Sequence, residues 1–290
     1  MNYRVTHRTT YWYNEPVSTS YHALRLTPRT LSHQNCRWSN LAMDPSPAFS
    51  SDRVDYFGNV LALVTVQEPH QQLAVEASSE VEVMARTWPE AGETPAWEQA
   101  CCLLADDLDP EKLDAFQFTF ESAQVRCLPQ FAEYARTSFM PGTPLLAAAL
   151  DLTARVHRDF TYDPSATEVT TPVERVFQER RGVCQDFAHF QIACLRSLGL
   201  AARYVSGYLQ TFAPPDRQRL IGADASHAWV SLYCPGLGWI DLDPTNNLAP
   251  STSYITLAWG RDYNDVSPIR GVIQGGGQHE LTVSVDVTSV

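Results

Sequence analysis

The spacing of apolar residues changes twice along the chain, and this change limits the folds that the chain can adopt. Residues 2–86 alternate apolar and polar side chains, which is the period of half-buried strands. Residues 144–159 and 184–198 instead place apolar side chains three and four positions apart, which predicts two helices. Further strands are expected over residues 201–209, 227–233 and 238–242. Helices followed by an antiparallel sheet favour an α+β fold over a doubly wound parallel sheet.

The same patterns divide the chain into three expected regions. Residues 1–88 are expected to form a β-rich N-terminal domain, because several short strands separated by turns are typical of an antiparallel β-sandwich. Residues 89–145 carry 3 basic and 10 acidic groups and two expected helices, which indicates an acidic helical connector packed on the next region. Residues 146–290 are expected to form the core, with residues 281–287 as its final strand.

The composition excludes several classes of function. The 290 residues carry 21 basic and 33 acidic side chains, a net charge of −12, which argues against a nucleic-acid partner. No apolar stretch reaches 18 residues, and the polar N-terminus lacks the apolar core of a signal peptide, so we expect neither a membrane partner nor export. The seven cysteines are odd in number and contain no CxxC pair, which argues against disulfides and zinc and favours a reducing cytoplasm. No metal or other cofactor is therefore expected.

Cys184 has the local setting of a nucleophile. It follows Gly182, which is expected to permit a tight turn, and it opens the second predicted helix. Free backbone N–H groups and the helix dipole at such a position favour the thiolate, which is the reactive form of cysteine. Arg180 and Arg181 lie just upstream and are expected to add to the positive field. His189 is on the same helix but rotated away, so we expect it to be structural.

A base and an orienting carboxylate lie downstream. His227 begins an apolar strand, and the next strand ends at Asp243, before Pro244. If the two strands pair as a hairpin, Asp243 lies beside His227, where a carboxylate fixes the imidazole tautomer and stabilises the imidazolium. Asp241 lies two residues earlier, on the same strand face by period two. The spacing alone does not separate these two carboxylates.

Three stretches resemble the motifs of the transglutaminase-like superfamily, in the order Cys, His, Asp: GVCQDFAH (182–189), SHAWV (226–230) and WIDLDPTNN (239–247). The similarity is greatest to bacterial transglutaminase-like proteins, regarded as cysteine proteases, that carry a β-rich N-terminal domain. It implies a papain-like core with Cys184 as nucleophile, His227 as base and acid, and Asp243 as orienting carboxylate. The chain lacks room for the two C-terminal barrels of animal transglutaminases, which argues against calcium dependence and protein crosslinking.

The implied reaction is acyl transfer from an amide, peptide or isopeptide substrate through a thioester on Cys184. The backbone N–H of Cys184 is expected to donate to the oxyanion. Tyr162, Gln178 and Trp229 are expected to shape the substrate cleft. Hydrolysis is preferred because nothing marks an amine site; transfer to an amine is the alternative. A catalytically silent binding module is the alternative of another class. The sequence leaves the oligomeric state open.

Overall fold

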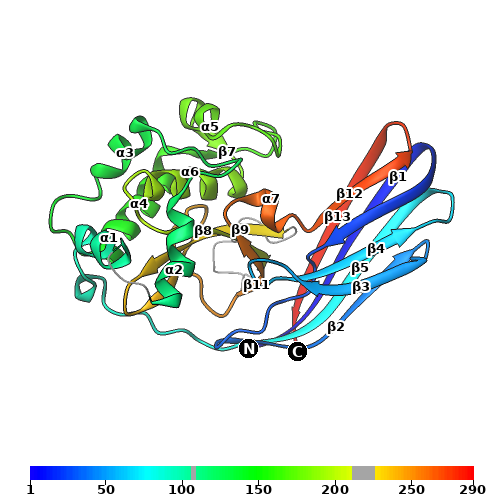
Figure 1. Ribbon diagram of the computed structural model, residues 1–290, viewed down its shortest axis with the longest axis horizontal. Coiled ribbons are helices and arrows are strands. Elements are labelled where there is room, and N and C mark those ends of the chain that lie inside the picture. Colours follow the sequence, from blue (N-terminus) through cyan, green and yellow to red (C-terminus); the bar gives the residue numbers. More distant parts are fainter. Residues whose placement is uncertain (106–108, 211–225) are drawn as a thin grey trace, which may run out of the picture.

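The computed structural model describes residues 1–105, 109–210 and 226–290. They form two parts that lie side by side: a β-rich part, and a part in which helices cover a smaller sheet (Figure 1). Both termini lie close together, at one end of the long strands (Figure 1). The predicted α+β class is confirmed, since most of the strands pair antiparallel and the helices gather in the second part.

The β-rich part is a sandwich made by bending long strands. Its seven strands are β1 (Asn2–Leu24), β2 (Gln34–Asp44), β3 (Phe49–Val54), β4 (Val60–Val66), β5 (His70–Val83), β12 (Ile269–Gly275) and β13 (His279–Ser289). The register of β1 breaks between Trp12 and Val17; before the break it lies between β5 and β13, and after it between β4 and β12. Leu73 of β5 and Val66 of β4 share one apolar cluster, so the two halves face each other as layers (Figure 1).

The C-terminal strand is a correction to the predicted regions. Residues 281–287 were expected to complete the core formed by residues 146–290, but they lie in β13 and pair with β1, from Tyr3↔Ser289 to Tyr13↔His279. The alternating pattern specifies which face of a strand is buried, not which strand is its partner. The N-terminal sheet is therefore completed by the C-terminus of the chain.

The second part is built around one antiparallel sheet and one buried helix. The sheet has the order β10-β9-β8-β11, and α6 packs against β8 and β9. From Asp186 to Arg196 every side chain of α6 is buried, so this helix is enclosed on all sides. The elements are α4 (Leu145–Asp159), β6 (Thr161–Tyr162), α5 (Val173–Glu179), β7 (Arg181–Gly182), α6 (Cys184–Arg196), β8 (Ala202–Leu209), β9 (Ser226–Cys234), β10 (Gly238–Leu242), β11 (Tyr254–Gly260) and α7 (Tyr263–Val266).

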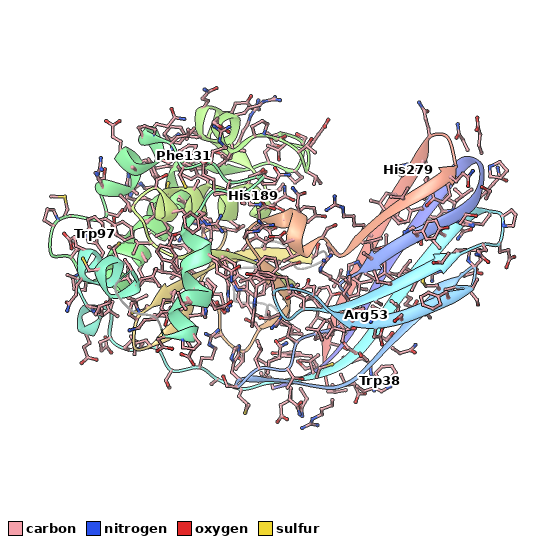
Figure 2. All side chains as sticks on the ribbon, in the orientation of Figure 1. Trp38, Arg53, Trp97, Phe131, His189 and His279 are labelled. Atoms are coloured by element: carbon pink, nitrogen blue, oxygen red, sulfur yellow. The ribbon has the colours of Figure 1, made fainter. Side chains whose placement is uncertain are left out.

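The connecting segment packs on this second part. It contains the 3-10 turns Ala91–Glu93 and Gln117–Thr119 and the helices α1 (Trp97–Ala105), α2 (Pro110–Phe116) and α3 (Pro129–Arg136). Phe131 of α3 is fully buried and packs edge-on against Phe190 of α6, 5.6 Å between ring centres. Figure 2 shows the side chains that fill the space between these helices and the sheet. Among the described residues, no helix is long and apolar enough to cross a bilayer.

The two parts share an apolar and polar interface. Tyr3 and Val5 of β1 belong to the same buried cluster as the residues of α6, and the Tyr3 hydroxyl donates to the Thr252 carbonyl at 2.9 Å. His7 Nδ1 lies 2.8 Å from the Tyr208 hydroxyl of β8. Near its bend, β1 thus packs inside the sandwich, whereas near its N-terminal end it packs on the core sheet. These contacts fix the sandwich against the second part.

Candidate active site

The N-terminus of α6 is held by one buried carboxylate. Asp186 accepts a hydrogen bond from the backbone N–H of Val183 at 2.8 Å and from the Thr167 hydroxyl at 2.6 Å. A Cβ on Gly182 would lie 2.5 Å from the Asp186 Oδ2 atom. Glycine is therefore required here by the close approach of this carboxylate, rather than by the tight turn predicted from the sequence. These contacts of Asp186 with Val183 and Gly182 fix the backbone that presents Cys184.

His227 and Asp243 form a buried pair next to Cys184. The His227 Nε2–H group donates to Asp243 Oδ2 at 2.7 Å, and both side chains are fully buried. The other ring nitrogen, Nδ1, is buried and makes no hydrogen bond of good geometry within the described part of the chain. Because Nε2 is occupied by Asp243, Nδ1 is the atom that is available to the Cys184 thiol.

Asp243 is fixed by five hydrogen bonds, the one from His227 included. Its Oδ1 atom accepts from the backbone N–H groups of Thr245 and Asn246, at 2.8 and 3.2 Å. Its Oδ2 atom also accepts from the Asn246 side-chain amide at 2.8 Å and from the Tyr254 hydroxyl at 2.6 Å. Such a network holds a buried carboxylate ionised and in one orientation.

The electrostatics of the pair favour the imidazolium. Burial lowers the pKa of His227, but the charge and hydrogen bond of Asp243, followed by those of Cys184, together raise the pKa well above its ordinary value. Burial raises the pKa of Asp243, whereas His227, Tyr254 and Asn246 outweigh it and lower the pKa. The negative carboxylate of Asp243 therefore lies beside the positively charged imidazole of His227, which lies beside the thiol of Cys184.

The two carboxylates that the sequence could not separate point to different partners. Asp241 lies within β10 and forms an ion pair with Arg86, 2.6 Å from Nη1 to Oδ2. Asp243 lies beyond the end of β10, where it forms an isolated bridge with Leu248. The strand register agrees with the expectation that both side chains lie on one face, because Asp241 pairs with Ser231, and His227, which bonds to Asp243, lies four residues before Ser231 on β9. His227 is bonded to Asp243.

The three residues predicted to shape the cleft differ in position. Tyr162 is half-buried near Cys184: burial, followed by the nearby Cys184 and Asp186 side chains, raises its pKa. Gln178 is exposed on α5. Trp229 is fully buried and lies 6.2 Å from the His227 ring, nearly parallel to it, so it has no surface to offer a substrate. The prediction for Trp229 is corrected to a residue that packs against His227.

The upstream arginines do not point their charge at Cys184. The Arg180 guanidinium lies 4.1 Å from the centre of the Phe177 ring, and Arg181 forms an ion pair with Glu179 at 3.3 Å. His189 is structural as expected: it is buried, and its Nε2 atom accepts from the Tyr263 N–H at 3.1 Å (Figure 2).

Sequence reasoning missed two residues that hold the carboxylate. Asn246 lies within the motif WIDLDPTNN, but the sequence gives no signal that its side-chain amide bonds to Asp243. Tyr254 comes from β11, and its hydroxyl reaches Asp243 only because the chain returns across the sheet. Within residues 1–105, 109–210 and 226–290, no group of three or more metal-binding side chains gathers.

The comparisons with known proteins follow the same division of the chain. The model of the bacterial transglutaminase-like N-terminal region matches residues 3–82, and that of the transglutaminase-like superfamily matches residues 132–244. An uncharacterized protein of Mycobacterium tuberculosis H37Rv is 42% identical, over 98% of this chain and 92% of its own length. The chain belongs to the bacterial transglutaminase-like family.

Two further matches to this transglutaminase-like protein differ in how much of the chain they cover. A crystal structure of a proposed cysteine protease from Cytophaga hutchinsonii matches with a TM-score of 0.77 and 22% identity, over 100% of this chain and 91% of that chain. This match shows a shared fold. A protein-glutamine gamma-glutamyltransferase of Pseudomonas aeruginosa is 31% identical over 41% of this chain, which is 18% of that protein.

Proposed function

We propose that the protein is a cysteine-dependent acyl-transfer enzyme that cleaves an amide, peptide or isopeptide bond. The observation that carries the proposal is the buried His227–Asp243 pair, whose free ring nitrogen is available to a thiol at the start of α6. Nucleophile, base and orienting carboxylate are the three roles that thiol catalysis requires. Membership of the transglutaminase-like family supports the same assignment.

In the proposed reaction, the Cys184 thiolate attacks the carbonyl carbon of the substrate. The first turn of α6 leaves backbone N–H groups without helical acceptors, and that of Cys184 donates to the oxyanion. The imidazolium of His227 gives its proton to the leaving amine as the C–N bond breaks, which leaves a thioester. His227 then takes a proton from water, the hydroxide oxygen attacks the thioester carbon, and the carboxylic acid leaves as the thiolate is restored.

Transfer to an amine is a second candidate for the deacylation step. It is favoured by the similarity to the glutamine gamma-glutamyltransferase of Pseudomonas aeruginosa, which covers part of this chain. The same three residues serve both outcomes, because an amine can replace water as the group that attacks the thioester. Exclusion of water from the cleft decides between them.

The experiment is to incubate the purified protein with a casein digest, with and without cadaverine, and to follow the peptides by mass spectrometry. Hydrolysis predicts shorter peptides or glutamine converted to glutamate; transfer predicts peptides that carry cadaverine. Both products should vanish in Cys184→Ala and persist in Cys36→Ala, a matched change of a thiol in the sandwich. Products that persist in Cys184→Ala would refute the assignment, and the absence of any product in the wild type would favour a binding module.

A further inference from the structure

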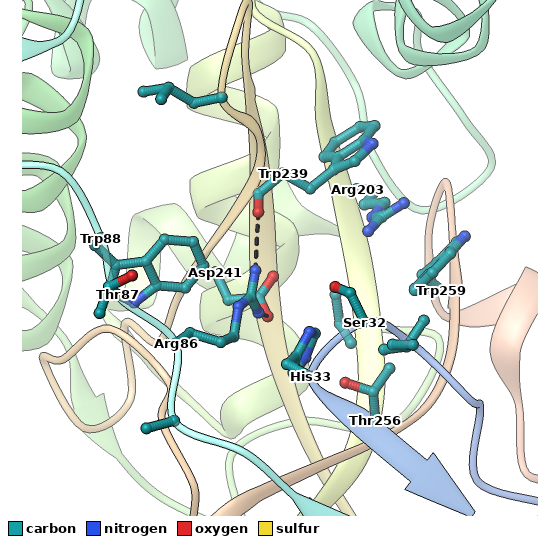
Figure 3. Close-up of a pocket in the computed structure, with 14 residues that line it drawn as sticks. Ser32, His33, Arg86, Thr87, Trp88, Arg203, Trp239, Asp241, Thr256 and Trp259 are labelled. Carbon is teal, nitrogen blue, oxygen red and sulfur yellow. Dashed lines mark hydrogen bonds and ion pairs between the residues drawn. The ribbon is translucent and has the colours of Figure 1, made fainter.

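A cavity of about 490 Å³ lies on the face of the core sheet that is turned away from α6. The outer faces of β8, β10 and β11 form its floor, and the segments before β2 and after β5 form its walls (Figure 3). It is thus built from both parts of the molecule. Its polar and aromatic lining includes Ser32, His33, Arg86, Trp88, Arg203, Trp239, Asp241, Thr256 and Trp259.

Within the described part of the chain, Arg203 is a buried cation without a hydrogen-bonded partner. Arg203 is 7% exposed, and its guanidinium lies between two indole rings, 4.0 Å from Trp239 and 3.7 Å from Trp259 (Figure 3). The buried Nε–H group has no acceptor, and no carboxylate of the described residues lies within ion-pair distance of this guanidinium. Burial, only partly offset by Asp241, lowers the pKa of Arg203 to about 9, so it remains charged at neutral pH.

The other ionisable groups of the cavity nearly cancel one another. Arg86 pairs with Asp241 at 2.6 Å, donates to the Trp239 carbonyl at 2.9 Å and covers the Trp88 ring at 4.0 Å (Figure 3). Burial and the nearby Arg86 lower the pKa of His33 to about 4, so its ring is neutral. Among the described residues that line the cavity, one positive charge, that of Arg203, therefore remains to be balanced.

We propose that this cavity binds a small monocarboxylate that carries a flat apolar group, with the carboxylate on Arg203. A guanidinium held between two rings cannot turn away, so its donors are already arranged for a carboxylate. The indoles provide apolar walls for the remainder of the ligand, and a single uncompensated charge matches a monoanion better than a phosphate dianion.

The cavity is separate from the candidate active site. Arg203 pairs with Ser231 of β9, four residues along that strand from His227, which is about 13 Å at about 3.3 Å per residue. A packed cluster that includes Val205, Trp229 and Tyr254 fills the sheet face between them. A ligand in this cavity would not contact Cys184.

The test is calorimetric titration of the protein with N-benzoylglycine, its uncharged primary amide and inorganic phosphate. We expect the acid to bind with a dissociation constant below 1 mM, and the amide and phosphate to bind at least tenfold more weakly. Arg203→Gln should weaken binding of the acid at least tenfold, and Asp241→Asn should strengthen it, because it removes the competing carboxylate. Arg4→Gln, which removes an arginine on the outer sheet face, is the matched control and should change nothing.

Ser32→Trp provides a test that leaves Arg203 in place, since Ser32 is exposed and a large side chain there fills the cavity. It should abolish binding even if Arg203→Gln proves poorly folded. Equal binding of the acid and its amide, unchanged binding in Arg203→Gln or Ser32→Trp, or no binding of the acid at 10 mM would each overturn the proposal. Alkylation of Cys184 in Arg203→Gln should match the wild type, so this test and that of the proposed function fail independently.

Discussion

Asp243→Asn removes the charge that orients and ionises His227 while changing the shape of the side chain little. The carboxylate lies 2.7 Å from Nε2 and both side chains are fully buried. With the two charge centres about 4 Å apart and an effective dielectric constant of about 20, the attraction is about 4 kcal/mol. At about 1.4 kcal/mol per pKa unit, the pKa of His227 should fall by about three units.

The sign of this change follows from the structure. Burial lowers the pKa of His227, and Asp243 is the largest contribution that raises it. The pKa of His227 is about 10 in the wild type, so a fall of about three units places it near 7, and at pH 8 most His227 rings of the variant would be neutral and unable to pair with a Cys184 thiolate. An ordinary thiol, with a pKa of about 8.5, is about a quarter ionised at pH 8. The account predicts a full thiolate at Cys184 of the wild type at pH 8, so its alkylation at that pH should slow about fourfold in Asp243→Asn.

The assay is the rate of iodoacetamide alkylation at Cys184 between pH 5 and 9, together with an NMR titration of the His227 ring. Asp241→Asn is the matched control, because it removes a carboxylate two residues away that pairs with Arg86 instead of His227. Circular dichroism and thermal melting establish that both variants are folded. The same pH profile in Asp243→Asn and in the wild type, or an equal slowing in Asp241→Asn, would refute the reasoning.

Three further changes test other parts of the structure. Gly182→Ala should destabilise the protein by about 1–3 kcal/mol in urea unfolding, because the new Cβ would meet the Asp186 carboxylate at 2.5 Å; an unchanged midpoint would contradict that close approach. Tyr254→Phe should cost about 1 kcal/mol by removing one donor to Asp243. It should slow Cys184 alkylation at pH 8 less than Asp243→Asn does, and an equal slowing would contradict this expectation. Burial lowers the pKa of His7 to about 4, so between pH 6.5 and 4 the unfolded chain binds a proton that the native state does not. The free energy of unfolding should therefore fall as pH decreases over that interval, by about 3 kcal/mol from His7 alone. His7→Gln should reduce this fall.

Local pattern was enough to predict most elements of this fold. The alternation in β1 predicts a half-buried strand, and Tyr3 and Val5 are indeed buried. Residues 58 and 59 predict a hairpin, and β3 pairs with β4 around Gly58, whose φ is +76°. The helix that starts at Cys184 was also predicted, because its apolar spacing is a local signal.

The features that could not be predicted depend on contacts between distant segments. The alternation of apolar and polar residues does not specify which strand a segment pairs with, so it does not predict that β13 completes the N-terminal sheet. Asp241 and Asp243 have different partners although they lie two residues apart, and the Tyr254 hydroxyl reaches Asp243 from another strand. The cavity around Arg203 likewise combines segments from residues 31 to 259, which no local pattern brings together.

The central claim is that His227 activates Cys184, and cysteine-resolved alkylation tests it most directly. Wild type and His227→Ala would be treated with iodoacetamide from pH 5 to pH 9, and each of the seven cysteines quantified by peptide mass spectrometry, with the exposed Cys102 as reference thiol. The account predicts that Cys184 reacts fastest in the wild type, stays reactive at pH 6, and loses both properties in His227→Ala. If Cys184 follows the profile of Cys102 in both proteins, the thiol is not activated and the assignment of a catalytic site is contradicted.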